Sequence, residues 1–317
     1  MERKDRIDTF GALVLITFSF LMGLNQVLIK LVNDGFSPVF QAGLRSACAL
    51  VPVVLFAVLA RRRLSITDGS LLPGILCGLL FSFEFVLLFT ALEFTSVSRA
   101  SVLFYTMPVW VAVAAHWLFP GERLTPRRLL GLAMAVVGVA WALLGRPAAD
   151  TGGALIGDIM CIIGALFWAG IAVVARSSRL SQSSPEMQLV YQLAVSAPLL
   201  LAISPLFGDV IRNVTPTILG IFSFQVLVVV SFGFLTWFWV LRIYPASDMT
   251  AFSFLAPLFG VLGGWLILDE EITPAIVGAL VLVGAGIALI SWRPKGPESR
   301  PVGGDRPGLI GRASSGG

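Results

Sequence analysis

The sequence is poor in charged residues, cysteine and histidine, and each shortage excludes a class of protein. Charged residues make up 13% of the 317 residues, about half of the fraction that is typical of soluble domains. The three cysteines, Cys48, Cys77 and Cys161, form no CxxC pair and lie in apolar stretches, so we expect no disulfide framework and no thiolate metal site. His116 is the single histidine, and HExxH and GxSxG patterns are missing. The usual signatures of metal-dependent and serine hydrolases are therefore absent.

Long apolar runs are abundant. Hydrophobic residues make up 57% of the chain, and they gather in stretches of about 20 residues, the length that a helix needs to cross a bilayer. The first run, from Phe10, is too long for a signal peptide and lacks its small-residue cleavage pattern. The net charge of +4 does not indicate a nucleic-acid partner, because the excess lies in short loops and a tail. We predict an all-α, multi-pass membrane protein.

The apolar runs predict ten transmembrane helices. Turn residues such as Asn33 to Gly35, the arginines Arg61 to Arg63, and the prolines Pro120 and Pro126 separate them. The predicted spans are 10–32, 37–60, 71–92, 98–119, 129–145, 154–175, 187–204, 217–241, 247–268 and 275–292.

The distribution of basic residues predicts the orientation. With the N-terminus in the cytoplasm, 17 of the 22 Lys and Arg residues fall on the cytoplasmic side and 3 on the other, while Lys30 and Arg45 lie within spans. Basic residues in short loops stay in the cytoplasm. Both termini are therefore predicted to be cytoplasmic, which also favours an even number of spans.

One pattern occurs twice with opposite charge around it. The stretches 108–126 and 257–274 both begin with Pro and end with Thr-Pro, and their Trp and Glu residues also match. The matching pairs are Pro108 and Pro257, Trp117 and Trp265, Glu122 and Glu270, Thr125 and Thr273, and Pro126 and Pro274. The loop of the first copy is basic and that of the second is acidic, so we expect the copies to cross the membrane in opposite directions.

Inverted internal repeats of this kind are typical of secondary transporters. The chain divides in a Gly/Pro/Ala/Asp-rich link, which gives a first five-helix repeat at 1–148 and a second at 149–293. The tail at 294–317 is rich in Gly, Pro, Ser and Arg, and we expect it to be disordered in the cytoplasm because it cannot bury an apolar face.

The segment ALEFTSVSRASVLFYTMPVWVAVAAHWLFPGERLTPRRLLGLAMAVVGV, together with its second copy, resembles the EamA-type repeat of the drug/metabolite transporter superfamily. The stretch from Gly23 to Lys30 is similar to the opening helix of that family. The resemblance implies a central cavity between the two halves, alternating access, and neither a cofactor nor an ATP-binding domain.

A finer resemblance is to amino-acid exporters of the YddG type. The segments that carry it are Phe81 to Glu84, Phe104 to Pro108, Leu166 to Ala169, and Phe254 to Pro257. This resemblance implies amino acids, including aromatic and hydrophobic ones, as the cargo, and it adds Met107 and Trp168 to the candidate cavity residues.

Charged groups inside the membrane are costly, so they are the first functional candidates. Arg45 and Glu84 each lie about 8 residues from the outer end of their predicted spans, which is roughly 12 Å at a rise of ~1.5 Å per residue. They could form an ion pair that binds substrate or gates the cavity, or a purely structural pair between neighbouring helices. Glu84 could also take up a proton and couple transport to the proton gradient.

Three neutral polar residues, Asn25, Tyr105 and Gln225, share this depth. A zwitterionic amino acid needs a cationic partner for its carboxylate and an acceptor for its ammonium group, and Arg45 and Glu84 could supply both. The alternative for each neutral residue is a hydrogen bond between helices. Asp158, nearer the outer surface, is expected either to line an outer vestibule or to face water.

The repeated prolines, Pro108 and Pro257, fall near the middle of their predicted spans. Proline removes an internal hydrogen bond and kinks a helix, so these residues are candidates for gating bends at matching places in the two repeats. The alternative is a static kink that packing requires.

The sequence thus predicts a secondary transporter in the bacterial inner membrane that moves small metabolites out of the cell, with amino acids as the predicted cargo. The alternative within the family is another cargo, such as a drug-like cation, a nucleoside or a sugar derivative. An intramembrane enzyme and a scaffold are disfavoured, because no catalytic motif is present and an inverted repeat brings a scaffold no advantage. The expected partners are the small-molecule cargo, membrane lipid and protons, with the chain a monomer or a homodimer.

Overall fold

The computed structural model describes residues 8–119, 123–145, 152–233, 236, 240, 243–244, 252 and 254–291. Within these ranges the chain is helical, and extended pairing is limited to one isolated antiparallel bridge between Phe36 and Ile211. The predicted all-α class is confirmed for this part of the molecule. The predicted disordered tail at 294–317 lies outside the described residues.

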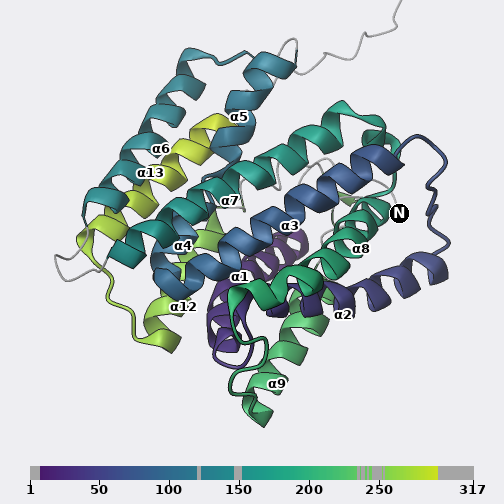
Figure 1. Cartoon of the computed structure of the whole chain (residues 1–317). Helices are drawn as coiled ribbons and strands as arrows, with labels where there is room; N and C mark the ends of the chain where they lie inside the picture. The colour runs from purple at the N-terminus through teal and green to yellow at the C-terminus, as the bar shows by residue number, and fades with distance from the viewer. Residues whose placement is uncertain are drawn as a thin grey trace, which may run out of the picture.

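Helices follow one another with short connections (Figure 1). The first half contains α1 (Thr9–Asn33), α2 (Pro38–Leu59), α3 (Leu71–Phe94), α4 (Val97–Phe104), α5 (Met107–Leu118) and α6 (Pro126–Leu144). The second half contains α7 (Gly152–Ser177), α8 (Pro185–Ile203), α9 (Pro216–Phe224) with a π-helical continuation (Gln225–Phe232), α12 (Leu255–Leu268) and α13 (Pro274–Ser291). Short 3₁₀ turns at Arg179–Gln182 and Ser204–Phe207 flank α8.

In the described residues, eight helical segments are long and apolar enough to cross a membrane, and α4 together with α5 forms one of them. Two shorter apolar helices, Pro216–Phe232 and Leu255–Leu268, overlap the predicted spans 217–241 and 247–268, parts of which lie outside the described residues. The chain is therefore a multi-pass membrane protein. The count of ten spans and the cytoplasmic placement of both termini stay predictions.

The repeated Thr-Pro pair has a local structural reason. Thr125 Oγ1 accepts a hydrogen bond from the backbone N–H of Arg128 at 3.3 Å, and Thr273 Oγ1 accepts one from Ile276 at 3.3 Å. In each copy the following proline is the first residue of the helix, a position where its missing N–H is harmless. The pair therefore caps and starts α6 and α13 in the same way.

The main helix packing joins the two halves of the chain. Helix α2 packs along α8, α3 along α7, α1 along α12, and α6 along α13, and Figure 1 shows α6 and α13 running side by side. Small residues allow two of these close approaches. A Cβ at Gly23 of α1 would lie 2.6 Å from the backbone oxygen of Ala256, and one at Gly131 of α6 would lie 2.6 Å from that of Gly286.

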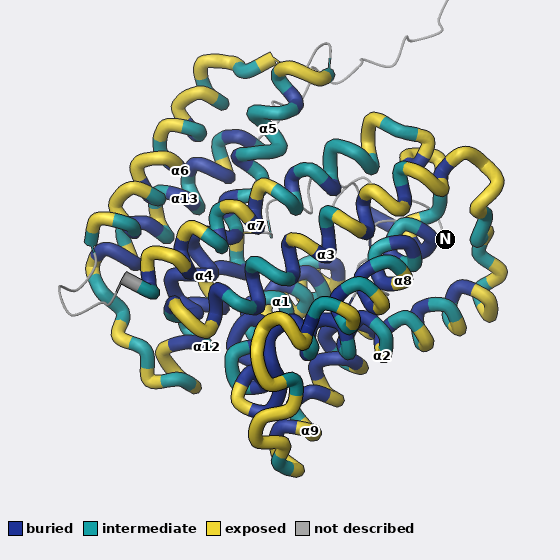
Figure 2. Tube along the Cα trace, in the orientation of Figure 1, coloured by how far each residue is buried: buried dark blue, intermediate teal, exposed yellow. Residues whose placement is uncertain are grey.

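The distribution of polarity is the reverse of that in a soluble protein. Large apolar side chains are exposed along the outer helix faces, as the yellow stretches on α2 and α6 in Figure 2 show; Leu55 is 55% exposed and Leu144 is 84% exposed. Charged side chains such as Arg45, Glu84 and Asp158 are buried. Lipid is the solvent that favours this arrangement, because hydrocarbon solvates apolar groups and not polar ones.

We predict that Gly23→Ala destabilises the fold by about 1–3 kcal/mol, because the added methyl group would meet backbone atoms of α12 that cannot move aside. Thermal unfolding of the purified protein in detergent measures the effect. Gly284→Ala is the matched control, because nothing lies within 4 Å of a Cβ at Gly284. Equal unfolding temperatures for the two variants would contradict the proposed packing of α1 on α12.

Candidate functional site

A cavity of about 130 Å³ lies between helices of both halves. A cavity needs a volume of about 10–15 Å³ to hold one water molecule. This cavity therefore has room for several waters or for part of a small molecule. Its lining from the first half comes from α1, α2, α3 and the α4–α5 junction, and from the second half it comes from α7, α8 and the π-helical segment. The polar residues that line it are Asn25, Gln26, Arg45, Ser46, Glu84, Tyr105 and Gln192.

Arg45 is fixed at one side of the cavity. Its guanidinium carbon lies 4.5 Å from the ring centroid of Phe85 and 4.6 Å from that of Phe89, distances at which a cation is attracted to an aromatic face. Arg45 Nη1 also donates a hydrogen bond to Asn25 Oδ1 at 3.3 Å, and the same oxygen accepts one from Gln225 Nε2 at 3.1 Å. The cation is thereby held against the cavity wall by neutral partners.

Glu84 lies on α3 and is 4% exposed. Its Oε2 atom is buried and has no hydrogen-bond partner. In the described part of the chain, Glu84 and Arg45 do not form the direct ion pair that the sequence allowed. A buried carboxyl oxygen without a donor is unfavourable by about 1–3 kcal/mol or more, so this group is ready to receive a donor from a molecule in the cavity.

Aromatic side chains form the remaining wall. Trp168 of α7 stacks on Phe104 with centroids 5.4 Å apart and an interplanar angle of 15°, and it meets Tyr105 edge-on at 6.5 Å. Phe81 and Phe85 of α3 also line the cavity, with centroids 3.9 Å apart. These rings present a large apolar surface next to Arg45 and Glu84.

The structure brings most of the predicted site residues together. Among the described residues, Asn25, Arg45, Glu84, Tyr105 and Trp168 line the cavity. Two other candidates are placed differently. Gln225 stands behind the wall and reaches the site through Asn25. Met107 begins α5 beyond a helix break and packs against the apolar core instead.

Both repeated prolines lie in the first turn of a helix. Pro108 is the second residue of α5, and α4 ends at Phe104, so Tyr105 and Thr106 separate the two helices. Pro257 is the third residue of α12, which begins at Leu255.

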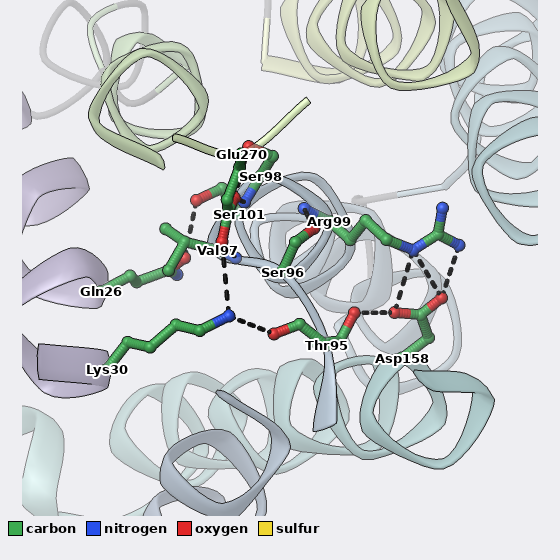
Figure 3. Close-up of polar contacts among 10 residues, drawn as sticks. All are labelled: Gln26, Lys30, Thr95, Ser96, Val97, Ser98, Arg99, Ser101, Asp158 and Glu270. Atoms are coloured by element: carbon green, nitrogen blue, oxygen red, sulfur yellow. Dashed lines mark hydrogen bonds and ion pairs between the residues drawn. The ribbon is translucent and has the colours of Figure 1, made fainter. Parts of the chain in front are cut away.

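A second polar cluster lies at the end of the bundle that carries Lys30, and Figure 3 shows it. Arg99 and Asp158 form a buried ion pair in which Arg99 Nη2 lies 2.6 Å and Nε 3.0 Å from Asp158 Oδ2. Arg99 Nη2 also donates to the backbone oxygen of Ala142, and Thr95 Oγ1 donates to Asp158 Oδ1. The expectation that Asp158 faces water or lines a vestibule is wrong, because Asp158 is fully buried and paired.

A model of the EamA-like transporter family matches residues 9–144 and, a second time, residues 155–292. The chain belongs to this family. The EamA-type resemblance noted in the sequence is thereby confirmed. A Bacillus subtilis protein named as an uncharacterized transporter, YoaV, is 28% identical over 277 residues, which cover 86% of this chain and 94% of that protein.

Two further relatives carry a more specific name. Proteins of Salmonella typhimurium and Escherichia coli, each named a probable amino-acid metabolite efflux pump, are both 27% identical to this EamA chain. The alignments cover 90% and 92% of this chain and 94% and 98% of theirs. One solved crystal structure with 19% identity superposes with a TM-score of 0.64 over 88% of this chain and 96% of its own, which shows a shared fold.

Several residues of this EamA chain's site do not stand out in the sequence. Gln26 follows Asn25 directly and lines the cavity beside it, and its Oε1 accepts a hydrogen bond from Ser101. Gln192 lies near the cytoplasmic end of its predicted span 187–204. It therefore does not share the predicted depth of Arg45 and Glu84, and depth alone does not identify it as a site residue. Within the described residues, no group of three or more His, Cys, Asp and Glu side chains could hold a metal ion.

We predict that Arg99→Leu or Asp158→Leu alone destabilises the protein by about 3–5 kcal/mol, because either change leaves an uncompensated buried charge. The double variant Arg99→Leu/Asp158→Leu is expected to regain part of this loss, since apolar residues can replace a buried pair. Thermal unfolding of the four proteins in detergent measures the coupling. Strictly additive losses would rule out a direct energetic link between the two side chains.

Proposed function

We propose that this EamA transporter exports amino acids across the bacterial inner membrane, by alternating access through the cavity between its two halves. The observation that carries the proposal is the unpartnered Oε2 of Glu84 in the same cavity as the guanidinium of Arg45. A zwitterion supplies an ammonium donor for the first and a carboxylate acceptor for the second. The names of the Salmonella and Escherichia relatives support the same cargo class.

The rest of the cavity suits the remainder of such a cargo. Amide groups of Gln26 and Gln192 can orient the polar end, and Phe104, Tyr105 and Trp168 can pack on a hydrophobic or aromatic side chain. Ligand sites generally combine a few well-placed polar groups with apolar walls. A drug-like cation would use Glu84 and the aromatic rings but would meet Arg45 with like charge, so we place it second.

We further propose that the two halves, 1–148 and 149–293, are inverted five-helix repeats with both termini in the cytoplasm. The two matches of the family model support two repeats, and the basic and acidic loops of the two copies support inversion. Pro108 and Pro257 then mark the bends around which the halves move. Glu84, as the carboxyl group with a free oxygen in the cavity, is the candidate carrier of a coupling proton.

Glu84→Gln is expected to abolish saturable exchange of amino acids in proteoliposomes or to raise its KM at least about tenfold, because a neutral amide forms no ion pair with an ammonium group and does not take up a proton. Uptake and counterflow of a labelled amino-acid panel measure the effect. Glu271→Gln is the matched control, since Glu271 lies on an exposed loop. Exchange that survives in Glu84→Gln would remove Glu84 from the site, and a wild-type protein inactive on every amino acid would shift the proposal to the cationic cargo.

Arg45→Gln is expected to raise the KM for amino acids by about ten- to a hundredfold, because a charge-assisted hydrogen bond contributes about 1.5–3 kcal/mol. Arg45→Lys is expected to fall between wild type and Arg45→Gln, since lysine keeps the charge but loses the planar fork. The control is Arg63→Gln on an exposed loop. A cargo whose transport improves in Arg45→Gln would point to a cation and against a zwitterion.

A further inference from the structure

Helix α4 connects the cavity with the Lys30 end of the bundle. It is eight residues long, which at ~1.5 Å per residue is roughly 12 Å, and all of its residues are buried. Its last residue, Phe104, and the next one, Tyr105, line the cavity. The regular α-helix is interrupted by a turn at Tyr105 and Thr106, which separates α4 as a short rod from α5.

A carboxylate from the other half of the chain holds the first turn of this rod. Glu270 lies between α12 and α13, and its Oε1 accepts a hydrogen bond from the backbone N–H of Val97 at 2.7 Å. Its Oε2 accepts from the N–H and the Oγ of Ser98 at 2.9 Å and 2.8 Å (Figure 3). The free N–H groups and the positive end of the dipole at a helix start make a carboxylate the best partner there.

Lys30 completes the contact from α1. Its Nζ lies 3.4 Å from Glu270 Oε1 and donates a hydrogen bond to the backbone oxygen of Thr95 at 2.9 Å. The packing beneath is close, since a Cβ at Gly264 would lie 2.5 Å from Glu270 Oε2 and 2.8 Å from Ser98 Oγ. The residues Lys30, Val97, Ser98 and Glu270, here called the Glu270 latch, therefore join α1, α4 and the α12–α13 loop.

The Glu270 latch can open more easily than the neighbouring ion pair. The Glu270 side chain is 11% exposed and that of Lys30 is 32% exposed, so water can take over their hydrogen bonds when the contact separates. Arg99 and Asp158 are 6% and 0% exposed, and separating them would leave bare buried charges. This pair and the stacking of Phe104 on Trp168 join α4 firmly to α7, while α4 also packs on α12.

We propose that the Glu270 latch closes the Lys30 end of the cavity, and that its release, with α4 moving away together with α7, opens this end during the transport cycle. The inference rests on the alternating access proposed above. A cargo in the cavity would contact Phe104 and Tyr105 at the end of α4, and Glu270 binds the first turn of the same helix. Movement of α4 therefore couples the cavity to the Glu270 latch. In the proposed orientation, this end faces the outside of the cell.

The test measures access to the cavity and needs no cargo. A cysteine replaces Leu88, a cavity-lining residue that is 5% exposed, in a background in which Cys48, Cys77 and Cys161 are changed to alanine. A membrane-impermeant maleimide is then applied to right-side-out and inside-out vesicles. The rate of labelling is compared between Glu270→Gln and Glu271→Gln, which remove the same charge from neighbouring positions of one loop.

We expect Glu270→Gln to label at least about tenfold faster from the outside, which corresponds to about 1.4 kcal/mol, and Glu271→Gln to label like the parent. Equal rates in the two variants, or an equal rise from both sides, which signals a loosened fold, would overturn the proposal. A faster labelling rate from the inside alone would keep the latch and refute the proposed orientation.

If Glu270→Gln does not fold, Ser98→Ala is tested in its place. A smaller increase of the labelling rate from one side is expected, and an unchanged rate overturns the proposal.

Discussion

Hydrocarbon cannot form hydrogen bonds, and the arrangement of this protein follows from that constraint. Every polar group within the membrane has to find its partner inside the helix bundle. Gln41 therefore donates to the backbone of Ile29, Asn33 to that of Phe89, and Ser196 to Ser46 across α2 and α8. The outer faces meanwhile carry leucine, valine and tryptophan. The polar interior is what makes a central site for a polar cargo possible in a chain with so few charges.

Two buried carboxylates, Glu84 in the cavity and Asp158 at the Lys30 end of the bundle, differ in how fully they are hydrogen-bonded. Asp158 is saturated by Arg99 and Thr95, so it stabilises one arrangement of α4 on α7. Glu84 keeps a buried oxygen without a donor. A saturated charge fixes a structure, whereas an unsaturated one leaves binding energy for a visiting molecule. This contrast, together with the position of Glu84 in the cavity lining, is why we propose Glu84 and not Asp158 as the carboxylate that binds cargo.

The broken fourth span connects these two regions. If it were one continuous helix, the cavity residue Tyr105 would be fixed to α5, which packs against α7 and α13. The break before Pro108 lets α4 belong to the second half through Arg99 and Trp168, although it lies in the first half of the sequence. Both α7 and the Glu270 loop contact this same short helix, so a change at one contact can reach the other through α4.

The sequence alone predicted the apolar spans, the repeat and the depth of the candidate site. These are properties of length and periodicity: a run of about 20 apolar residues has to span the bilayer, and depth follows from helical rise. For that reason the spacing of Asn25, Arg45, Glu84 and Tyr105 along their spans is enough to place them at one level. Only the tertiary structure decided which side chains face one another at that level. It separated Met107 from the cavity, placed Gln225 behind Asn25, and paired Asp158 with Arg99, because the rotation of each helix about its axis depends on contacts between residues far apart in the chain.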